Sequence, residues 1–184
     1  MIDPGPATPL RVLLIEDSED DAAQELRQLK QGGYEVAHKR VESESDMRAA
    51  LDDATWDIVI SDYRMPRFSG LAALAVLRER DTDLPFIVVS GTIGEETAVA
   101  MMKAGASDYV MKGNLTRLAA AVRRELRDAE TRIERRQART ALRESEQRFR
   151  QLAETIGDAF FIQDVGAPRI HYVSPAYEAI WGRT

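Results

Sequence analysis

The sequence predicts an α/β protein in which a doubly wound, five-stranded parallel sheet is followed by a long C-terminal helix. Between residues 10 and 111, short apolar runs alternate with stretches whose apolar side chains recur at helical spacing. The apolar runs are nearly continuous, which is typical of strands that are buried on both faces. Neither Pro nor Gly occurs between Asn114 and Ile156, so a single helix can continue through that region.

Five segments are predicted to be strands. Residues 10–15, 57–61 and 84–90 are rich in Leu, Ile and Val, whereas residues 34–41 and 107–111 carry a weaker strand pattern. Because helical stretches separate these segments, we expect right-handed crossovers between parallel strands.

Four helices are predicted between the strands. Gly32-Gly33 is expected to end the first helix and Gly105 the fourth, since glycine readily adopts the conformation that ends a helix. The apolar positions at helical spacing are Leu26 and Leu29, then Met47, Ala50 and Leu51, then Leu71, Leu74 and Leu77, and then Ala98, Met101 and Met102.

The composition excludes several kinds of protein. The chain has 184 residues, no Cys and two His, which excludes a disulfide framework, a thiolate zinc site, a Cys nucleophile and a histidine-rich metal cage. No apolar run approaches the ~20 residues of a membrane-spanning helix. The N-terminus lacks the basic and apolar regions of a secretory signal. We therefore expect a cytoplasmic protein without membrane contact, in which residues 1–9 form a flexible N-terminus.

The charge is unevenly distributed along the chain. Residues 1–113 contain 21 Asp and Glu against 12 Lys and Arg, a net charge of −9, and residues 114–184 contain 10 against 13, a net charge of +3. Such a difference indicates an acidic domain followed by another kind of structure. An acidic domain is poorly suited to bind nucleic acid directly, because phosphate contacts need clustered basic residues.

Polar side chains follow four of the predicted strands at the point where each strand ends. These are Glu16 and Asp17, Asp62, Ser90 and Lys112. In a doubly wound sheet, the carboxyl ends of the strands border the functional crevice. Three carboxylates in one crevice repel one another unless a cation lies between them, and oxygen ligands suit Mg²⁺. Lys112 and Ser90 could then contact a further anion.

These residues belong to a longer pattern that resembles the receiver domain of two-component response regulators, a flavodoxin-like fold. The resemblance covers residues 10–125. Its motifs are Glu16-Asp17, Asp62-Tyr63-Arg64-Met65-Pro66 with Ser69-Gly70, Ser90-Gly91, and Asp108-Tyr109-Val110-Met111-Lys112.

The resemblance implies a role for each matched residue. Asp62 would accept a phosphoryl group from a phosphohistidine on a partner, either a sensor histidine kinase or a phosphotransfer protein. Mg²⁺ would be the cofactor, held by Glu16, Asp17, Asp62 and the backbone carbonyl of Arg64. Lys112 would pair with the phosphoryl oxygens. Ser90 and Tyr109 would form the switch, with Ser90 moving toward the phosphoryl group and Tyr109 swinging inward.

The chain departs from the family pattern after the lysine. The family usually has a proline with a cis peptide bond there, whereas this chain has Gly113, so we expect a trans or alternative loop beside Lys112. Ser90 replaces the commoner Thr and keeps the hydroxyl. Arg64 is long enough to lie across the phosphoryl group, and we hypothesise that it controls water access and phosphoryl lifetime.

A long helix is predicted over residues 114–152, continuing the last receiver helix. An eleven-residue repeat favours a straight or slightly right-handed packing seam along it over a left-handed heptad coil. One interpretation is a solvated linker; the favoured one is a signalling helix that pairs with its copy in a parallel homodimer. Its arginines could suggest nucleic-acid binding, which the interspersed Glu disfavours. The seam consists of Leu115, Leu118, Val122, Leu126, Ala129, Ile133, Gln137 and Thr140.

Residues 153–184, with the helix that enters them, resemble the opening of a PAS sensor domain. The central helix and the closing strands of that family are absent, so a complete ligand pocket cannot form. We expect a truncated α+β fragment of a longer protein, either flexible or packed against a neighbouring chain. His171 is expected on a strand surface rather than at a metal or haem.

The sequence therefore predicts a Mg²⁺-dependent phosphoacceptor switch that signals through a helix to a PAS-containing output. It is not predicted to be an enzyme beyond its own phosphoryl uptake and slow hydrolysis. One alternative is a degenerate receiver that acts only as an interaction module. Another is the regulatory part of a hybrid sensor histidine kinase or of a cyclic-dinucleotide enzyme such as a diguanylate cyclase.

Overall fold

The computed structural model describes residues 7–80, 83–91, 95–164, 166 and 169–182. The chain divides into two compact units, Met1–Ile133 and Glu134–Thr184. Each unit is described by itself.

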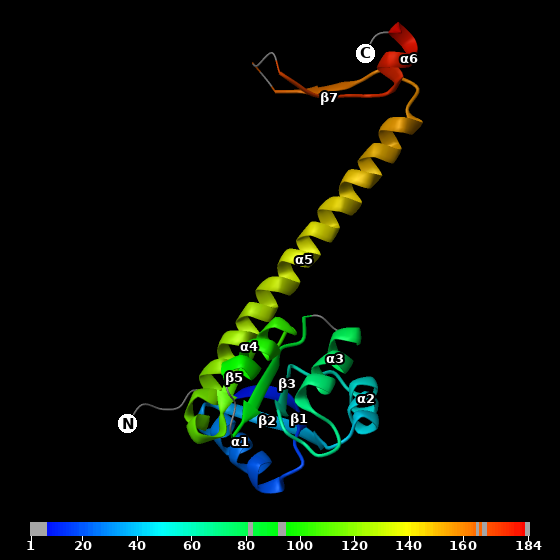
Figure 1. Cartoon of the computed structure of the whole chain (residues 1–184). Coiled ribbons are helices and arrows are strands. Elements are labelled where there is room, and N and C mark those ends of the chain that lie inside the picture. Colours follow the sequence, from blue (N-terminus) through cyan, green and yellow to red (C-terminus); the bar gives the residue numbers. More distant parts are fainter. Residues whose placement is uncertain (1–6, 81–82, 92–94, 165, 167–168, 183–184) are drawn as a thin grey trace, which may run out of the picture. The chain divides into compact units, whose positions relative to one another are not determined.

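The first unit is built on one parallel sheet with the strand order β2-β1-β3-β4-β5 (Figure 1). Every neighbouring pair is parallel, which confirms the predicted doubly wound sheet. The core strands β3 and β4 are buried along their whole length, as their continuous apolar runs indicate. The strands are β1 (Thr8–Ile15), β2 (Tyr34–Val41), β3 (Ile58–Asp62), β4 (Phe86–Ser90) and β5 (Asp108–Met111).

Helices cover both faces of this sheet. One core lies between the sheet and helices α2, α3 and α4, and the other between the sheet and helices α1 and α5. Ser18 and Ser43 cap the amino ends of α1 and α2 by accepting backbone hydrogen bonds. The helices are α1 (Glu19–Gln31), α2 (Glu44–Asp53), α3 (Gly70–Arg80), α4 (Glu95–Lys103) and α5 (Leu118–Thr155).

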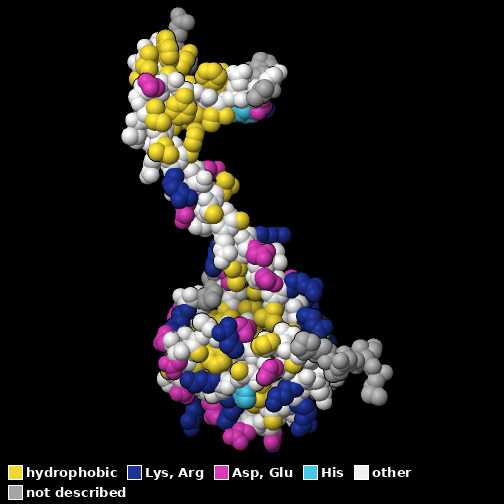
Figure 2. All heavy atoms as spheres, turned by 180° about the vertical axis from the view of Figure 1, so that it is seen from behind, with side chains coloured by type: hydrophobic (Ala, Val, Ile, Leu, Met, Phe, Trp, Pro, Cys, Tyr) yellow, Lys and Arg dark blue, Asp and Glu magenta, His cyan; other side chains and the backbone are white. Residues whose placement is uncertain are grey.

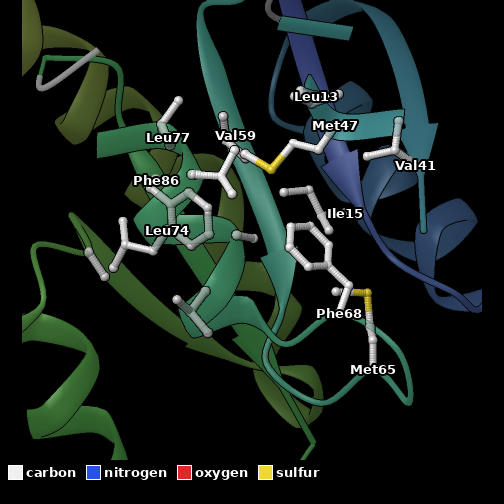
Figure 3. Close-up of a cluster of buried hydrophobic side chains, with 14 of the residues drawn as sticks. Leu13, Ile15, Val41, Met47, Val59, Met65, Phe68, Leu74, Leu77 and Phe86 are labelled. Carbon is white, nitrogen blue, oxygen red and sulfur yellow. The ribbon is translucent and has the colours of Figure 1, made fainter. Parts of the chain in front are cut away.

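The first core continues into the loop after β3. Figure 3 shows Phe68 of this loop lying beside Ile15, with Met65 next to Phe68, while Phe86 and Leu74 lie close to each other. The loop is therefore anchored by its own buried side chains, which fixes the backbone next to the end of β3.

Gly32, at the carboxyl end of α1, lies against α5 and leaves no room for a side chain. A Cβ atom at this position would overlap the Cβ of Ala119. Because both atoms are attached to backbone, Gly32→Ala must displace one helix, and we expect it to lower the free energy of unfolding by about 1–3 kcal/mol. Urea unfolding checks this. Gly113→Ala, where a Cβ would meet nothing within 4 Å, should change stability by less than about 0.5 kcal/mol; equal losses in the two variants would contradict the argument.

Two local expectations were wrong. Thr8 and Pro9 are not flexible, because they pair with Tyr34 and Glu35 as the first residues of β1; residues 1–6 lie outside the described part. The terminal helix also begins later than expected. A 3₁₀ helix, η1 (Lys112–Arg117), precedes α5, and Asn114 has non-helical angles. No cis peptide bond occurs among the described residues, in line with the expectation for Gly113.

Helix α5 has 38 residues, and the burial of its side chains changes along its length. In the first unit, Leu118, Val122 and Ala129 are buried against the rest of the unit. Further along, Gln137 and Thr140 are exposed. The amino-terminal part of the predicted seam is therefore part of the core, and only its carboxyl-terminal part remains free for other contacts within the described chain.

The second unit contains the end of α5, an antiparallel hairpin of β6 (Phe161–Gln163) and β7 (Ile170–Val173), and the short helix α6 (Ala176–Trp181). The ring of Tyr172 contacts those of Phe149 and Phe160, with centroids 5.1 and 5.9 Å apart. Among the described residues from 153 on, Ala153 and Ser174 are the buried ones. Figure 2 shows hydrophobic side chains gathered on the surface of this unit.

His171 lies on β7, where its Nε2 is 2.8 Å from Asp164 Oδ2 and its side chain is exposed. This placement agrees with the predicted strand-surface position. None of the described helices combines the length and the apolar composition needed to cross a membrane.

Candidate functional site

The polar residues predicted to meet at the sheet edge do so. Glu16 and Asp17 follow β1, Asp62 is the last residue of β3, Ser90 is the last residue of β4, and Lys112 directly follows β5. Because these strands are neighbours in one parallel sheet, their carboxyl ends lie side by side.

Three carboxylates form the centre of the site. Oxygen atoms of Glu16, Asp17 and Asp62 lie within 4.8 Å of one another, with Glu16 and Asp62 buried and Asp17 exposed. Burial raises the pKa of Glu16, although hydrogen bonds from the Ser18 amide and from Lys112 act in the opposite direction. An all-oxygen set with one solvent-facing member suits Mg²⁺, which binds a few carboxylates and keeps several waters. The donor set therefore fits Mg²⁺.

Lys112 supplies the positive charge of the site. Its Nζ lies 2.9 Å from Glu16 Oε2, 2.5 Å from Asp21 Oδ2 and 3.3 Å from Asp62 Oδ2. Burial lowers the pKa of Lys112, but the hydrogen bonds to Asp21 and Glu16 and the charge of Asp62 outweigh it, so the pKa lies above its usual value. The side chain is therefore a permanent ammonium at neutral pH.

Asp21 was not among the predicted site residues. It lies in the first turn of α1, where the Ser18 hydroxyl accepts a hydrogen bond from its backbone amide at 3.3 Å. The position four residues after Asp17, on a helix that begins at the site, is the sequence feature that could have indicated it.

Arg40 is a second residue that the sequence analysis did not identify. From the end of β2, its Nη1 donates to the carbonyl oxygens of Glu16 at 3.0 Å and Asp17 at 3.3 Å, and its Nη2 contacts Glu19 at 3.2 Å. Arg40 thereby holds the backbone that carries the two acidic side chains. No local pattern distinguishes this arginine from the others on the surface.

The remaining predicted residues lie on β4, on β5 and in the loop after β3. Ser90 is buried, Tyr109 is half-buried, and Arg64 is exposed, with its backbone amide 3.4 Å from Asp62 Oδ1. The loop carrying Arg64 returns closely to the strand end at Gly70, where a Cβ would lie 2.8 Å from the carbonyl oxygen of Asp62. Glycine at this position therefore allows the loop to close over the end of β3.

A buried acid lies one helical turn beyond Asp21. Glu25 is 1% exposed, and its Oε1 has no hydrogen-bond partner in the described structure. Burial, and next the charge of Glu16, raise the pKa of Glu25 to about 8. Glu25 is therefore largely uncharged at neutral pH.

Comparison with protein families gives two matches along the chain. Residues 12–123 match the model of the response regulator receiver domain, and residues 147–184 match a PAS domain model. The first match ends within the amino-terminal part of α5, and the second begins near the end of that helix.

Individual proteins are similar to this chain over part of its length. The transcriptional regulatory protein PrrA of Mycobacterium tuberculosis is 34% identical over 111 residues, which are 60% of this chain and 46% of that protein. The C4-dicarboxylate transport transcriptional regulatory protein DctD of Pseudomonas aeruginosa is 37% identical over 106 residues, 55% of this chain and 22% of that protein. The chain thus spans less than half the length of these curated relatives.

Among solved structures, the signal receiver domain of a signal transduction histidine kinase from Syntrophus aciditrophicus is similar to this chain. It is 26% identical, with a TM-score of 0.56, and the match covers 65% of this chain and 91% of that one.

Proposed function

Because this chain belongs to the response regulator receiver domain family, we propose that it is a Mg²⁺-dependent phosphoacceptor switch whose acceptor is Asp62. The phosphoryl donor would be a phosphohistidine on a sensor histidine kinase or a phosphotransfer protein. Receiver domains accept phosphoryl groups from such kinases. The assignment of the individual residues of this chain is the proposal.

One observation carries the proposal: the buried carboxylate of Asp62 lies beside two further carboxylates and 3.3 Å from an ammonium. Phosphoryl transfer depends mainly on position and on neutralised charge, because charge is spread over the phosphoryl oxygens in the transition state. Glu16, Asp17, Asp62 and the carbonyl of Arg64 would hold Mg²⁺, which supplies charge neutralisation and orientation for a phosphoryl group when bound.

The chemistry at Asp62 is a substitution at phosphorus. A carboxylate oxygen of Asp62 forms the new P–O bond, and the bond from phosphorus to the donor nitrogen breaks, leaving a neutral imidazole after protonation. Lys112 is placed to pair with the phosphoryl oxygens. The new group adds about −1.5 to −2 charges. Ser90, whose hydroxyl can donate, and Tyr109 on the neighbouring strand β5 would respond to this charge as the switch.

The direct test uses a small phosphodonor. We expect the purified chain, incubated with acetyl phosphate and Mg²⁺, to gain one phosphoryl group that maps to the peptide containing Asp62. Chelating the metal should prevent the reaction. Intact-mass and peptide mass spectrometry measure both results. A chain that gains no phosphoryl group under these conditions would support the degenerate receiver, which acts only as an interaction module.

Arg64 is expected to affect how long the phosphoryl group persists. Its side chain is exposed two residues after Asp62, on a loop held against the strand end. If it shields the phosphoryl group from water, Arg64→Ala should hydrolyse the acyl phosphate roughly 3- to 10-fold faster, a change of about 1 kcal/mol in the barrier. Loss of phosphoprotein after removal of the donor gives the rate. Arg67→Ala, at another exposed position of the same loop, is the control, and an unchanged rate in Arg64→Ala would refute the shielding role.

The proposal also includes how the phosphorylated state is passed on to the rest of the protein. We place the switch in the cytoplasm, with α5 relaying the phosphorylated state to the PAS-containing region and pairing with its copy in a homodimer. Exposed apolar residues on the free part of α5, such as Leu142 and Leu152, support such a pairing. Similarity to the receiver domain of a histidine kinase keeps a hybrid kinase as the second candidate. Assays of the full-length protein with ATP would separate the two.

A further inference from the structure

The ammonium of Lys112 is not centred on the proposed acceptor. Of its three carboxylate partners, Asp21 is nearest at 2.5 Å, Glu16 follows at 2.9 Å, and Asp62 is farthest at 3.3 Å. The ammonium of Lys112 therefore lies closer to the carboxylate on helix α1 than to the oxygen atoms that would carry the phosphoryl group.

Asp21 is well placed to hold this lysine. Its backbone lies in the first turn of α1, where the Ser18 cap determines its position. Its side chain is only 35% exposed. Glu16 and Asp62 are also the oxygen donors proposed for Mg²⁺, so their contacts with Lys112 would compete with that role. Asp21 has no part in the proposed metal site, and its contact with Lys112 does not face this competition.

We propose that Asp21 is a positioning residue that retains Lys112 on the α1 side of the site until phosphoryl transfer, when the ammonium exchanges Asp21 for a phosphoryl oxygen. The inference rests on the proposed function of Asp62. Asp21 slows transfer because it competes with the phosphoryl oxygens for the lysine.

Removing this carboxylate should speed phosphoryl uptake. We expect Asp21→Asn to be phosphorylated about 3- to 10-fold faster than the unsubstituted chain by acetyl phosphate and Mg²⁺, the range for a partly exposed, charge-assisted contact. Asp20→Asn is the matched control, since it removes the same charge from the same helical turn at an exposed position. Its rate should stay within about twofold of the unsubstituted chain, because the charge of Asp20 is screened by solvent.

Two further measurements distinguish positioning from a general effect of charge or folding. In a Lys112→Ala background, the Asp21→Asn change should alter the rate by less than about twofold, because the residue through which Asp21 acts is gone. In the metal-free chain, Lys112 should be acylated severalfold faster by an amine-reactive ester once Asp21 is Asn. Lys103, which is exposed, serves as the internal reference for the acylation.

The outcomes separate this inference from the proposed function. If the unsubstituted chain is phosphorylated on Asp62 but Asp21→Asn and Asp20→Asn react equally fast, the positioning role is refuted while the phosphoacceptor stands. Persistence of the Asp21→Asn effect without Lys112 refutes it as well. If no chain is phosphorylated, the proposed function fails, and the acylation of Lys112 alone decides whether Asp21 holds the lysine.

Discussion

Replacing Asp62 by Asn is expected to abolish phosphoryl incorporation, reducing the rate with acetyl phosphate and Mg²⁺ by more than about 100-fold. The amide has nearly the same size as the carboxylate, so the packing at the end of β3 is preserved. It lacks the anionic oxygen that would attack phosphorus in the proposed reaction, and it removes one of the three carboxylates of the central cluster. Mass spectrometry of the intact chain measures the incorporated group.

The stability of this variant should not fall with its activity. Asp62 is buried among like charges, and neutralising it relieves repulsion, so the thermal midpoint of Asp62→Asn should be equal to or above that of the unsubstituted chain. Asp53→Asn, on the exposed end of α2, is the control and should be phosphorylated normally. Undiminished phosphorylation of Asp62→Asn, or transfer of the label to Asp17, would show that Asp62 is not the acceptor.

The second large effect concerns stability and pH. Glu25 is buried without a partner for Oε1, and its pKa is raised to about 8 from an ordinary value of 4.5. The folded chain therefore keeps a proton on Glu25 at pH values where the unfolded chain has lost it. The contribution of Glu25 to the free energy of unfolding is therefore fully present below pH 4.5. This contribution is lost as the pH rises to about 8. A shift of this size corresponds to about 3–5 kcal/mol.

Glu25→Gln should remove this pH dependence. The difference in free energy of unfolding between the variant and the unsubstituted chain should move by about 3–5 kcal/mol in favour of the variant between pH 4.5 and 8.5. The surrounding charges are those of Glu16, Lys112, Asp62 and Asp21, and they are common to both proteins. Urea unfolding across this pH range gives the curves.

An exposed glutamate provides the comparison for this experiment. Glu35 lies on the exposed side of β2. The plot of the free energy of unfolding against pH for Glu35→Gln should therefore run parallel to that of the unsubstituted chain, within about 0.5 kcal/mol. Parallel curves for Glu25→Gln would mean that Glu25 is ionised in the folded chain.

Much of the fold follows from local sequence patterns. The runs at residues 10–15, 57–61 and 84–90 predicted β1, β3 and β4 because a strand buried on both faces is apolar at nearly every position. The residues at the strand ends were predicted to converge because parallel strands share one carboxyl edge. Their convergence is confirmed by the structure, while their chemical roles stay predictions.

Other features could be indicated by spacing but were not recognised. Glu25 shares a helix face with Ala22 and Leu29, three and four residues away, and both of these are buried. The spacing thus placed a carboxylate on the apolar face of α1. A glutamate in a helix rich in polar residues is usually solvent-facing, which is why the pattern alone did not mark it as buried.

The sequence alone predicted the parallel sheet, the family resemblance and the group of Glu16, Asp17, Asp62, Ser90 and Lys112. This was possible because periodicity and strand ends depend on residues that are neighbours in the sequence. Only the tertiary structure revealed that Lys112 lies closer to Asp21 than to Asp62, although 91 residues separate Lys112 from Asp21 in the chain. It also revealed that the amino-terminal part of α5 belongs to the core. Ion pairs and packing between distant segments depend on where the folded backbone brings side chains within a few ångströms, and no local pattern encodes that distance.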